Sequence, residues 1–216
     1  MPAHHYMLPA GRRLPGARDH IARMGYFVLH APRQSGKTTA LLALARELVA
    51  EGSHVSALVS MEVGAPFHDN IEGLELPVLD DWRQSLAAQL PPELLPPPWP
   101  DAPAGRRVGA ALSAWASSSS RPLAVFLDEV DALRDDALVA VLRQLRAGFP
   151  SRPGGFPASL ALVGLRDVRD YVVASGGSGR LGTASPFNIK VESITLRDFT
   201  RDEIGELYAQ HTGDTG

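Results

Sequence analysis

Cysteine is absent from this 216-residue chain. Disulfide bonds and thiolate metal sites are therefore excluded, and the redox compartment is left open. Histidine offers no replacement, because His4 and His5 lack the rest of a ligand set, and His30, His54 and His68 share no ligand spacing. The sequence thus gives no basis for a site that binds a transition metal.

Long apolar runs and an excess of one charge are also missing. No stretch reaches the length of a membrane helix, and the first 16 residues lack the apolar core of a signal peptide. A formal net charge of −3 and a pI near 6.2 give no general attraction to nucleic acid or to an anionic membrane. We therefore expect a cytoplasmic protein, with no membrane partner and no indication of a nucleic-acid partner.

Lysine is scarce as well. Of the 21 basic residues only Lys37 and Lys190 are lysines, and the chain is rich in alanine, proline, glycine and arginine. This composition is typical of a bacterial genome of high GC content. A chain that otherwise favours arginine keeps lysine at position 37, next to a glycine.

What is present is the pattern of one α/β domain with a sizeable core. Short apolar runs predict strands at 26–31, 54–63, 122–127, 159–164 and 189–196. Helix-forming residues predict helices at 17–24, 38–51, 79–90, 108–117, 135–147 and 200–210. Thr200 and Glu203 have the spacing of a capping box at the start of the last helix. Because the central strands lack alternation, we expect a parallel sheet with helices on both faces.

A proline-rich segment interrupts the region between the second and third strands. Seven of the thirteen residues 91–103 are proline, which excludes a helix or a central strand there. We therefore predict that residues 91–104 form an exposed surface loop with partial polyproline II character. A tolerated insertion is the favoured interpretation, and a partner-docking segment is the alternative.

Residues 31–38, APRQSGKT, fit the Walker A spacing, with alanine in place of the first glycine. Such a loop holds phosphates through backbone N–H groups and the positive end of the following helix. Gly36 allows close backbone approach, the compact ammonium of Lys37 reaches the β- and γ-phosphates, and the Thr38 hydroxyl binds Mg²⁺. The residues predicted to bind the nucleotide are Pro32, Arg33, Gln34, Ser35, Gly36, Lys37, Thr38 and Thr39.

An apolar strand that ends in two acids, LAVFLDE at 123–129, has the Walker B pattern. Asp128 is predicted to hold Mg²⁺ opposite Thr38, at the carboxyl end of a parallel strand. Glu129 is placed to orient or deprotonate the water that attacks the γ-phosphate. Adjacent Asp and Glu residues favour a hydrolytic ATPase over a small-molecule kinase or a GTPase. Asp131 is expected to be a helix cap or a loop residue.

Arg166 follows the fourth predicted strand. If that strand lies between the Walker A and Walker B strands, Arg166 faces the γ-phosphate and can stabilise its charge during catalysis. The alternative is a surface arginine paired with Asp167 or Asp170. Arg33 and Arg180 are weaker candidates for the same role.

Four segments together resemble a family of bacterial AAA-like ATPases, within the AAA+ and signal-transducing ATPase group. They are 26–39 (YFVLHAPRQSGKTT), 125–131 (VFLDEVD), 160–171 (LALVGLRDVRDY) and 185–213, which begins SPFNIK. The resemblance runs from about His5 across most of the chain. It implies a three-layer α/β/α P-loop core of the ASCE type, with strand order 5-1-4-3-2.

The same resemblance implies the domain organisation. Residues 1–24 would help to seat the adenine, and residues 25–216 would form the ATPase core. Relatives continue into a helical lid, and the chain ends at Gly216, where that lid is expected to begin, so we expect the lid to be absent. Members of the wider group act as switches or motors, frequently as homo-oligomers or with protein partners.

The function predicted first is Mg²⁺-dependent ATP hydrolysis that drives a conformational switch, with Lys37, Glu129 and Arg166 as catalytic residues. One alternative is a regulatory module that binds ATP or ADP without useful turnover. A nucleic-acid-remodelling ATPase is a further alternative, which the family's breadth allows but no basic stripe in the sequence supports.

Overall fold

The computed structural model describes Leu8 and residues 10–30, 32, 34–67, 70–164 and 192–215. Its centre is a five-stranded sheet in which every neighbouring pair is parallel. The strands are β1 (Tyr26–His30), β2 (Val55–Ser60), β3 (Leu123–Asp128), β4 (Ser159–Gly164) and β5 (Glu192–Thr195). They lie in the order β2-β3-β4-β1-β5. This is the ASCE order 5-1-4-3-2, so the predicted fold class is confirmed.

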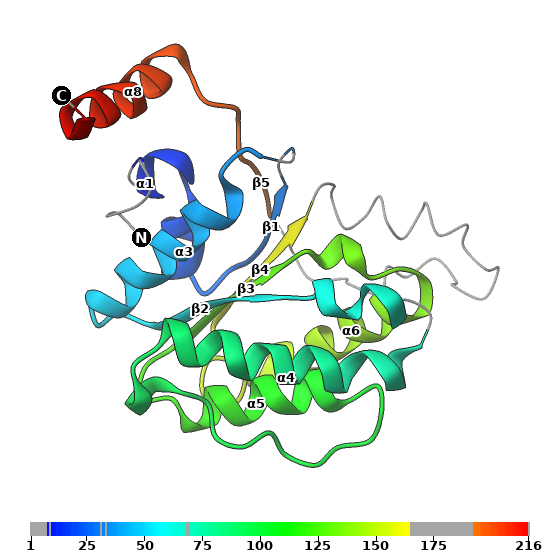
Figure 1. The fold of residues 1–216 in the computed structure, drawn as a ribbon. Coiled ribbons are helices and arrows are strands. Elements are labelled where there is room, and N and C mark those ends of the chain that lie inside the picture. The colour runs from blue at the N-terminus through cyan, green and yellow to red at the C-terminus, as the bar shows by residue number, and fades with distance from the viewer. Residues whose placement is uncertain are drawn as a thin grey trace.

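Helices cover both faces of the sheet, as Figure 1 shows. The α-helices are α1 (Ala10–Arg13), α2 (Ala17–Ala22), α3 (Lys37–Ala50), α4 (Ile71–Gln89), α5 (Arg107–Ser118), α6 (Asp135–Gly148) and α8 (Arg201–Thr215). Short 3₁₀ turns are η1 (Glu62–Phe67), η2 (Pro92–Leu94), η3 (Val130–Ala132) and η4 (Phe149–Ser151). None of the helices in the described residues is both long enough and apolar enough to cross a membrane.

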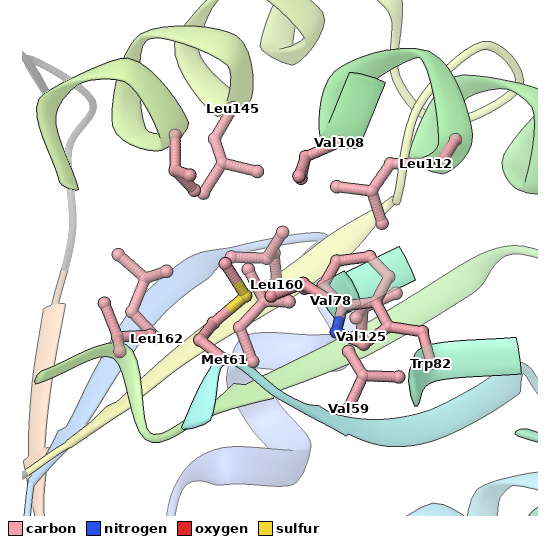
Figure 2. Packing of buried hydrophobic residues seen from close by; sticks show 14 of the residues in the cluster. Val59, Met61, Val78, Trp82, Val108, Leu112, Val125, Leu145, Leu160 and Leu162 are labelled. Carbon is pink, nitrogen blue, oxygen red and sulfur yellow. The ribbon is translucent and has the colours of Figure 1, made fainter. Parts of the chain in front are cut away.

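Side chains alternate between two buried layers along each strand. On β1, Tyr26 and Val28 belong to the larger layer beneath α4, α5 and α6, whereas Phe27 and Leu29 face α2 and α3 in the smaller layer. Figure 2 shows part of the larger layer, where Met61 and Trp82 meet side chains of β2, β3, β4, α5 and α6. Burial on both faces explains why the strands are apolar without alternation.

Several predicted boundaries were wrong, among them the end of the last helix, which was predicted at residue 210 and lies at Thr215. Two others have a clear physical cause. The predicted helix 79–90 in fact begins at Ile71, because the Asn70 side chain accepts a hydrogen bond from the Gly73 N–H (3.1 Å) and the helix accommodates Pro77. The predicted strand 54–63 ends at Ser60, because the Met61 N–H donates to the Asp128 carbonyl (2.9 Å) and the chain turns into η1.

The proline-rich segment lies against the helical layer and is less exposed than predicted. Pro91 and Leu95, on either side of η2, have polyproline II angles (φ −65° and −67°, ψ 153° and 148°). Pro96 is buried, and the Trp99 indole N–H donates to the Leu79 carbonyl (2.9 Å) while Arg83 lies over its ring. The segment is therefore a strap packed on α4.

A buried carboxylate fixes the start of α5, directly after the strap. Glu75 of α4 is fully buried and accepts hydrogen bonds from the backbone N–H groups of Gly105, Arg107 and Val108 (2.6, 3.0 and 3.2 Å). The amide of Gln144, on α6, donates to the same carboxylate (2.9 Å). One side chain thus joins three helices and takes the place of a local N-cap.

Strand β2 forms one edge of the sheet, and side chains of α4 cover part of this edge. The Gln89 side-chain amide accepts from the Leu58 N–H (3.0 Å) and donates to the Leu58 carbonyl (2.7 Å). The Trp82 indole donates to the Ser60 carbonyl (2.8 Å). These backbone groups of the edge strand are therefore satisfied within the chain.

Candidate functional site

The carboxyl ends of β1, β3 and β4 bring the two sequence motifs together. The Thr38 hydroxyl donates to Asp128 Oδ2 (2.9 Å), and the Lys37 ammonium lies 3.8 Å from Asp128 Oδ1. Lys37 also donates to the carbonyl of Gly164 at the end of β4 (3.4 Å). Since β4 lies between β1 and β3, the predicted convergence of residues 37, 38 and 128 is present in the structure.

The loop between β1 and α3 has the alternating backbone expected of an anion-binding turn. Gln34 and Gly36 have left-handed φ values of 62° and 76°, and the Ser35 hydroxyl donates to the Pro32 carbonyl (2.9 Å). Helix α3 begins at Lys37, and its N-cap Gly36 offers no side chain to cap the first turn. The N–H groups of that turn are therefore available to an anion.

Glu129 stands at the end of β3 in a left-handed conformation (φ 54°), which is uncommon for a residue with a side chain. Its backbone N–H donates to Asp128 Oδ1 (2.9 Å), which stabilises this turn. Burial, and after it the Asp128 carboxylate, raises the pKa of Glu129, whereas Lys37 acts to lower it. A carboxylate with a raised pKa beside a loop that could hold an anion is suited to act as a general base.

Asp131 lies in η3 and points toward the end of β4. One of its carboxylate oxygens is buried and has no hydrogen-bond partner among the described residues. A Cβ atom at Gly164 would lie only 2.7 Å from that oxygen, so the carboxylate occupies the space that glycine leaves open. Asp131 was expected to be a helix cap or a loop residue, and it lies instead within a short 3₁₀ turn, where it packs against the strand end that Lys37 contacts.

Arg13, at the end of α1, is buried against the outside of the phosphate loop, with only 4% of its surface exposed. Its Nη2 donates to the carbonyls of Ser35 and Arg197, each at 2.9 Å. Its guanidinium carbon lies 3.9 Å from the centre of the Phe199 ring, and Nη1 is 3.4 Å from Glu203 of α8. Arg13 therefore connects the N-terminal segment, the phosphate loop and α8.

The predicted capping box of α8 is confirmed. The Thr200 N–H donates to Glu203 Oε2 (2.9 Å), and the Glu203 N–H donates to the Thr200 hydroxyl (3.3 Å). Arg197 donates to both oxygens of the same carboxylate (2.7 and 2.9 Å). These bonds to Arg197, then the bond from Thr200, lower the pKa of Glu203 to about 2.

The structure describes most of the residues that were predicted to form the site. Pro32, Gln34, Ser35, Gly36, Lys37 and Thr38 line the loop and the first turn of α3, and Thr39 is exposed on that turn. Arg33 and Arg166 lie outside the described residues, as does Arg180. Arg13 and Phe199 could not be found from the sequence, because no spacing or motif marks either residue.

The residues present fit a magnesium ion bound with a nucleotide. Thr38 and Asp128 offer a hydroxyl and a carboxylate oxygen within hydrogen-bond distance of each other, and hard oxygen donors are what Mg²⁺ prefers. The Lys37 ammonium lies close enough to the Asp128 carboxylate for their opposite charges to attract each other. A bound phosphate would replace Asp128 as the partner of the ammonium. Magnesium in P-loop sites keeps waters and phosphate oxygens as its other ligands, so two protein groups suffice.

Comparisons with known proteins find similarity in structure alone. No protein-family model matches the chain, and no curated protein matches it. The chain is similar to Cdc6p from Pyrobaculum aerophilum, with a TM-score of 0.50 and 14% sequence identity, over 94% of this chain and 51% of that chain. It thus spans about half the length of that protein. At this identity the likeness concerns the fold.

A chain in the structure of Drosophila ORC bound to GC-rich DNA and Cdc6 is also similar. The TM-score is 0.48 and the sequence identity 14%, over 93% of this chain and 30% of that chain. This chain therefore corresponds to less than a third of that one.

Proposed function

We propose that this chain is an AAA+ P-loop ATPase that binds ATP with Mg²⁺ and uses hydrolysis of the β–γ phosphoanhydride to drive a conformational switch. The observation that supports this most is the meeting of the Lys37 ammonium, the Thr38 hydroxyl and the Asp128 carboxylate at the carboxyl ends of β1 and β3, on either side of β4. Glu129 adjoins them, with a raised pKa.

Each of these residues has a distinct part in the proposed activity. Lys37 and the backbone N–H groups of the loop bind the phosphates. Thr38 and Asp128 hold magnesium, which supplies positive charge beside the phosphate oxygens when it is bound. Glu129 orients the attacking water and accepts its proton. Arg166 is proposed to stabilise the charge on the γ-phosphate.

Two substitutions test this proposal. Lys37→Ala is expected to weaken ATP binding by about tenfold to a hundredfold, because a charge-assisted contact to phosphate is lost. Glu129→Gln is expected to keep ATP affinity and to lower turnover by about 10²- to 10⁴-fold, the usual contribution of a general base. Calorimetric titration of ATP and measurement of released phosphate give both quantities.

Two exposed residues serve as controls that remove the same kind of charge away from the site. Arg46→Ala removes an exposed cation from α3, and Glu93→Gln removes an exposed carboxylate from the strap. Both should leave binding and turnover at the parent values. Turnover of Glu129→Gln at the parent rate would show that the catalytic assignment is wrong.

The same two measurements separate the alternative functions. Tight nucleotide binding with no phosphate release in the parent protein would identify a regulatory module in place of an ATPase. Turnover that rises on addition of DNA or RNA would favour a nucleic-acid-remodelling ATPase.

A further inference from the structure

We propose that Arg13 is a positioning residue that orients the phosphate-binding loop, and that Glu203 of α8 holds Arg13 in place. The inference rests on the proposed nucleotide site and adds a residue that no motif contains. It also links phosphate binding to the position of a helix on the other side of the loop.

Arg13 acts on the peptide group between Ser35 and Gly36. In a trans peptide the C=O and the N–H point in opposite directions. Arg13 Nη2 donates to the Ser35 carbonyl (2.9 Å) and so holds that oxygen on the outside of the loop. The Gly36 N–H then points away from Arg13, into the turn where a phosphate binds. If this peptide rotated, a carbonyl oxygen would face the phosphate and repel it.

The backbone around this peptide can rotate. Gly36 has a left-handed φ of 76° and follows Gln34, with φ 62°. Glycine has little steric preference between such conformations, so the loop alone does not determine the direction of the Ser35 carbonyl. A fixed external donor such as Arg13 is therefore needed to select one orientation.

Arg13 is itself held in place by the start of α8 and the segment before it. Its guanidinium is buried and requires a negative partner. Glu203 supplies that charge at 3.4 Å, and it is itself only 2% exposed. The Arg197 carbonyl accepts a further bond from Arg13 (2.9 Å). The first turn of α8 and the segment before it thus fix the position of the guanidinium.

Phe199 makes the same connection through packing. Its ring lies beside the Arg13 guanidinium, with 3.9 Å between the guanidinium carbon and the ring centre. The edge of the ring also approaches Gly36, since a Cβ there would lie 3.4 Å from Phe199 Cζ. Movement of α8 would therefore change the contacts of both Arg13 and the loop.

The test compares Arg13→Gln with Arg12→Gln. Arg12 makes an exposed ion pair with Glu206 of α8 (2.7 Å), so its variant removes a link between the same two helices without touching the loop. Arg13→Gln should raise the KM for ATP about tenfold, the value of one charge-assisted hydrogen bond, with kcat retained at saturation. Arg13→Lys keeps a cationic donor and should recover part of the affinity. Arg12→Gln should change neither constant.

A spectroscopic measurement tests the orientation directly and needs no nucleotide. The Gly36 amide resonance of the nucleotide-free protein should shift in Arg13→Gln and in Glu203→Gln, and stay at its parent position in Arg12→Gln. If Arg13→Gln does not fold, Arg13→Lys and Glu203→Gln decide the matter by the same resonance. An unmoved Gly36 amide in these variants, or a parent KM in folded Arg13→Gln, would overturn the inference.

The two proposals fail in different ways. A parent protein that binds no nucleotide would contradict the proposed function, while the Gly36 resonance would still report whether Arg13 orients the loop. A parent protein that binds ATP, with Gly36 insensitive to Arg13, would contradict only the present inference.

Discussion

At the scale of single residues, backbone strain gathers at the candidate site. Among the described residues, three that are not glycine have positive φ: Met24, Gln34 and Glu129. Two of these lie in the phosphate loop and at the end of the Walker B strand. Such conformations cost about 1–3 kcal/mol each and persist where the surrounding structure enforces them, most often at functional sites.

Gly164 provides a test at this scale. Gly164→Ala places a Cβ 2.7 Å from the buried Asp131 oxygen, so the carboxylate or the end of β4 must move. We expect a loss of about 1–3 kcal/mol in the free energy of unfolding, the usual cost of overpacking, together with weaker nucleotide binding through Lys37. Urea denaturation and ATP titration measure the two effects.

Gly154→Ala is the matched control, because a Cβ at that position meets no atom within 4 Å. The clash also predicts that Asp131→Ala restores part of the stability in the Gly164→Ala background, as a double-mutant cycle would reveal. Equal stability of Gly164→Ala and Gly154→Ala would contradict the close packing described for this strand end.

At the scale of elements, helix α5 depends on a carboxylate from another helix. Its N-cap residue Arg106 makes no side-chain capping bond, and Glu75 of α4 accepts the N–H groups there. Glu75→Gln removes the negative charge from the positive end of α5 and leaves an NH₂ group facing N–H donors. We expect a loss of about 1–3 kcal/mol in the free energy of unfolding.

Hydrogen exchange distinguishes the loss of the capping bonds at the start of α5 from a general loss of stability. The amides of Arg107 and Val108 should exchange faster in Glu75→Gln under native conditions, before the strands do. Glu72→Gln, an exposed change on the same helix, should alter neither stability nor exchange. Unchanged exchange at the start of α5 in Glu75→Gln would argue against the capping role.

The first turn of α8 should respond to acid. Hydrogen bonds from Arg197 and Thr200 lower the pKa of Glu203 from 4.5 to about 2. A lowered folded-state pKa means that Glu203 stabilises the folded protein fully above pH 4.5, and that this contribution is lost as the pH falls toward 2. In the folded protein, the Thr200 amide resonance should therefore titrate with a midpoint near pH 2.

Glu203→Gln should abolish the acid response of Thr200, since no carboxylate remains to titrate. Thr200 resonances that titrate near pH 4.5 in the parent protein would mean that Glu203 keeps its ordinary pKa. The ion pair with Arg197 would then contribute little.

The sequence predicted correctly those features that depend on residues close together in the chain. The capping box at Thr200 and Glu203 lies within four residues, so its outcome is visible in the sequence. The start of α4 was missed because Pro77 normally marks a helix boundary, yet here it lies inside the helix that Asn70 caps. The strap was predicted as extended but not as packed, because its contacts with α4 are tertiary.

At the scale of the whole molecule, the site was predictable because parallel strands end at one edge. Lys37 and Asp128 stand 91 positions apart in the printed sequence, yet each follows a strand whose place in the sheet the motifs imply. Arg13 was not predictable in this way. Its partners Ser35 and Glu203 are 22 and 190 positions away, and neither pairing belongs to a recurring pattern.

The cover that α4 provides for β2 has a consequence in concentrated solution. A neighbouring molecule that approached this rim with an extended segment would find the Leu58 amide and carbonyl already engaged by Gln89, and the Ser60 carbonyl engaged by Trp82. Intermolecular strand addition, the first event in fibre growth, would have to displace both side chains before it could bond with these groups. Gln89 and Trp82 thereby oppose strand addition at these positions of β2.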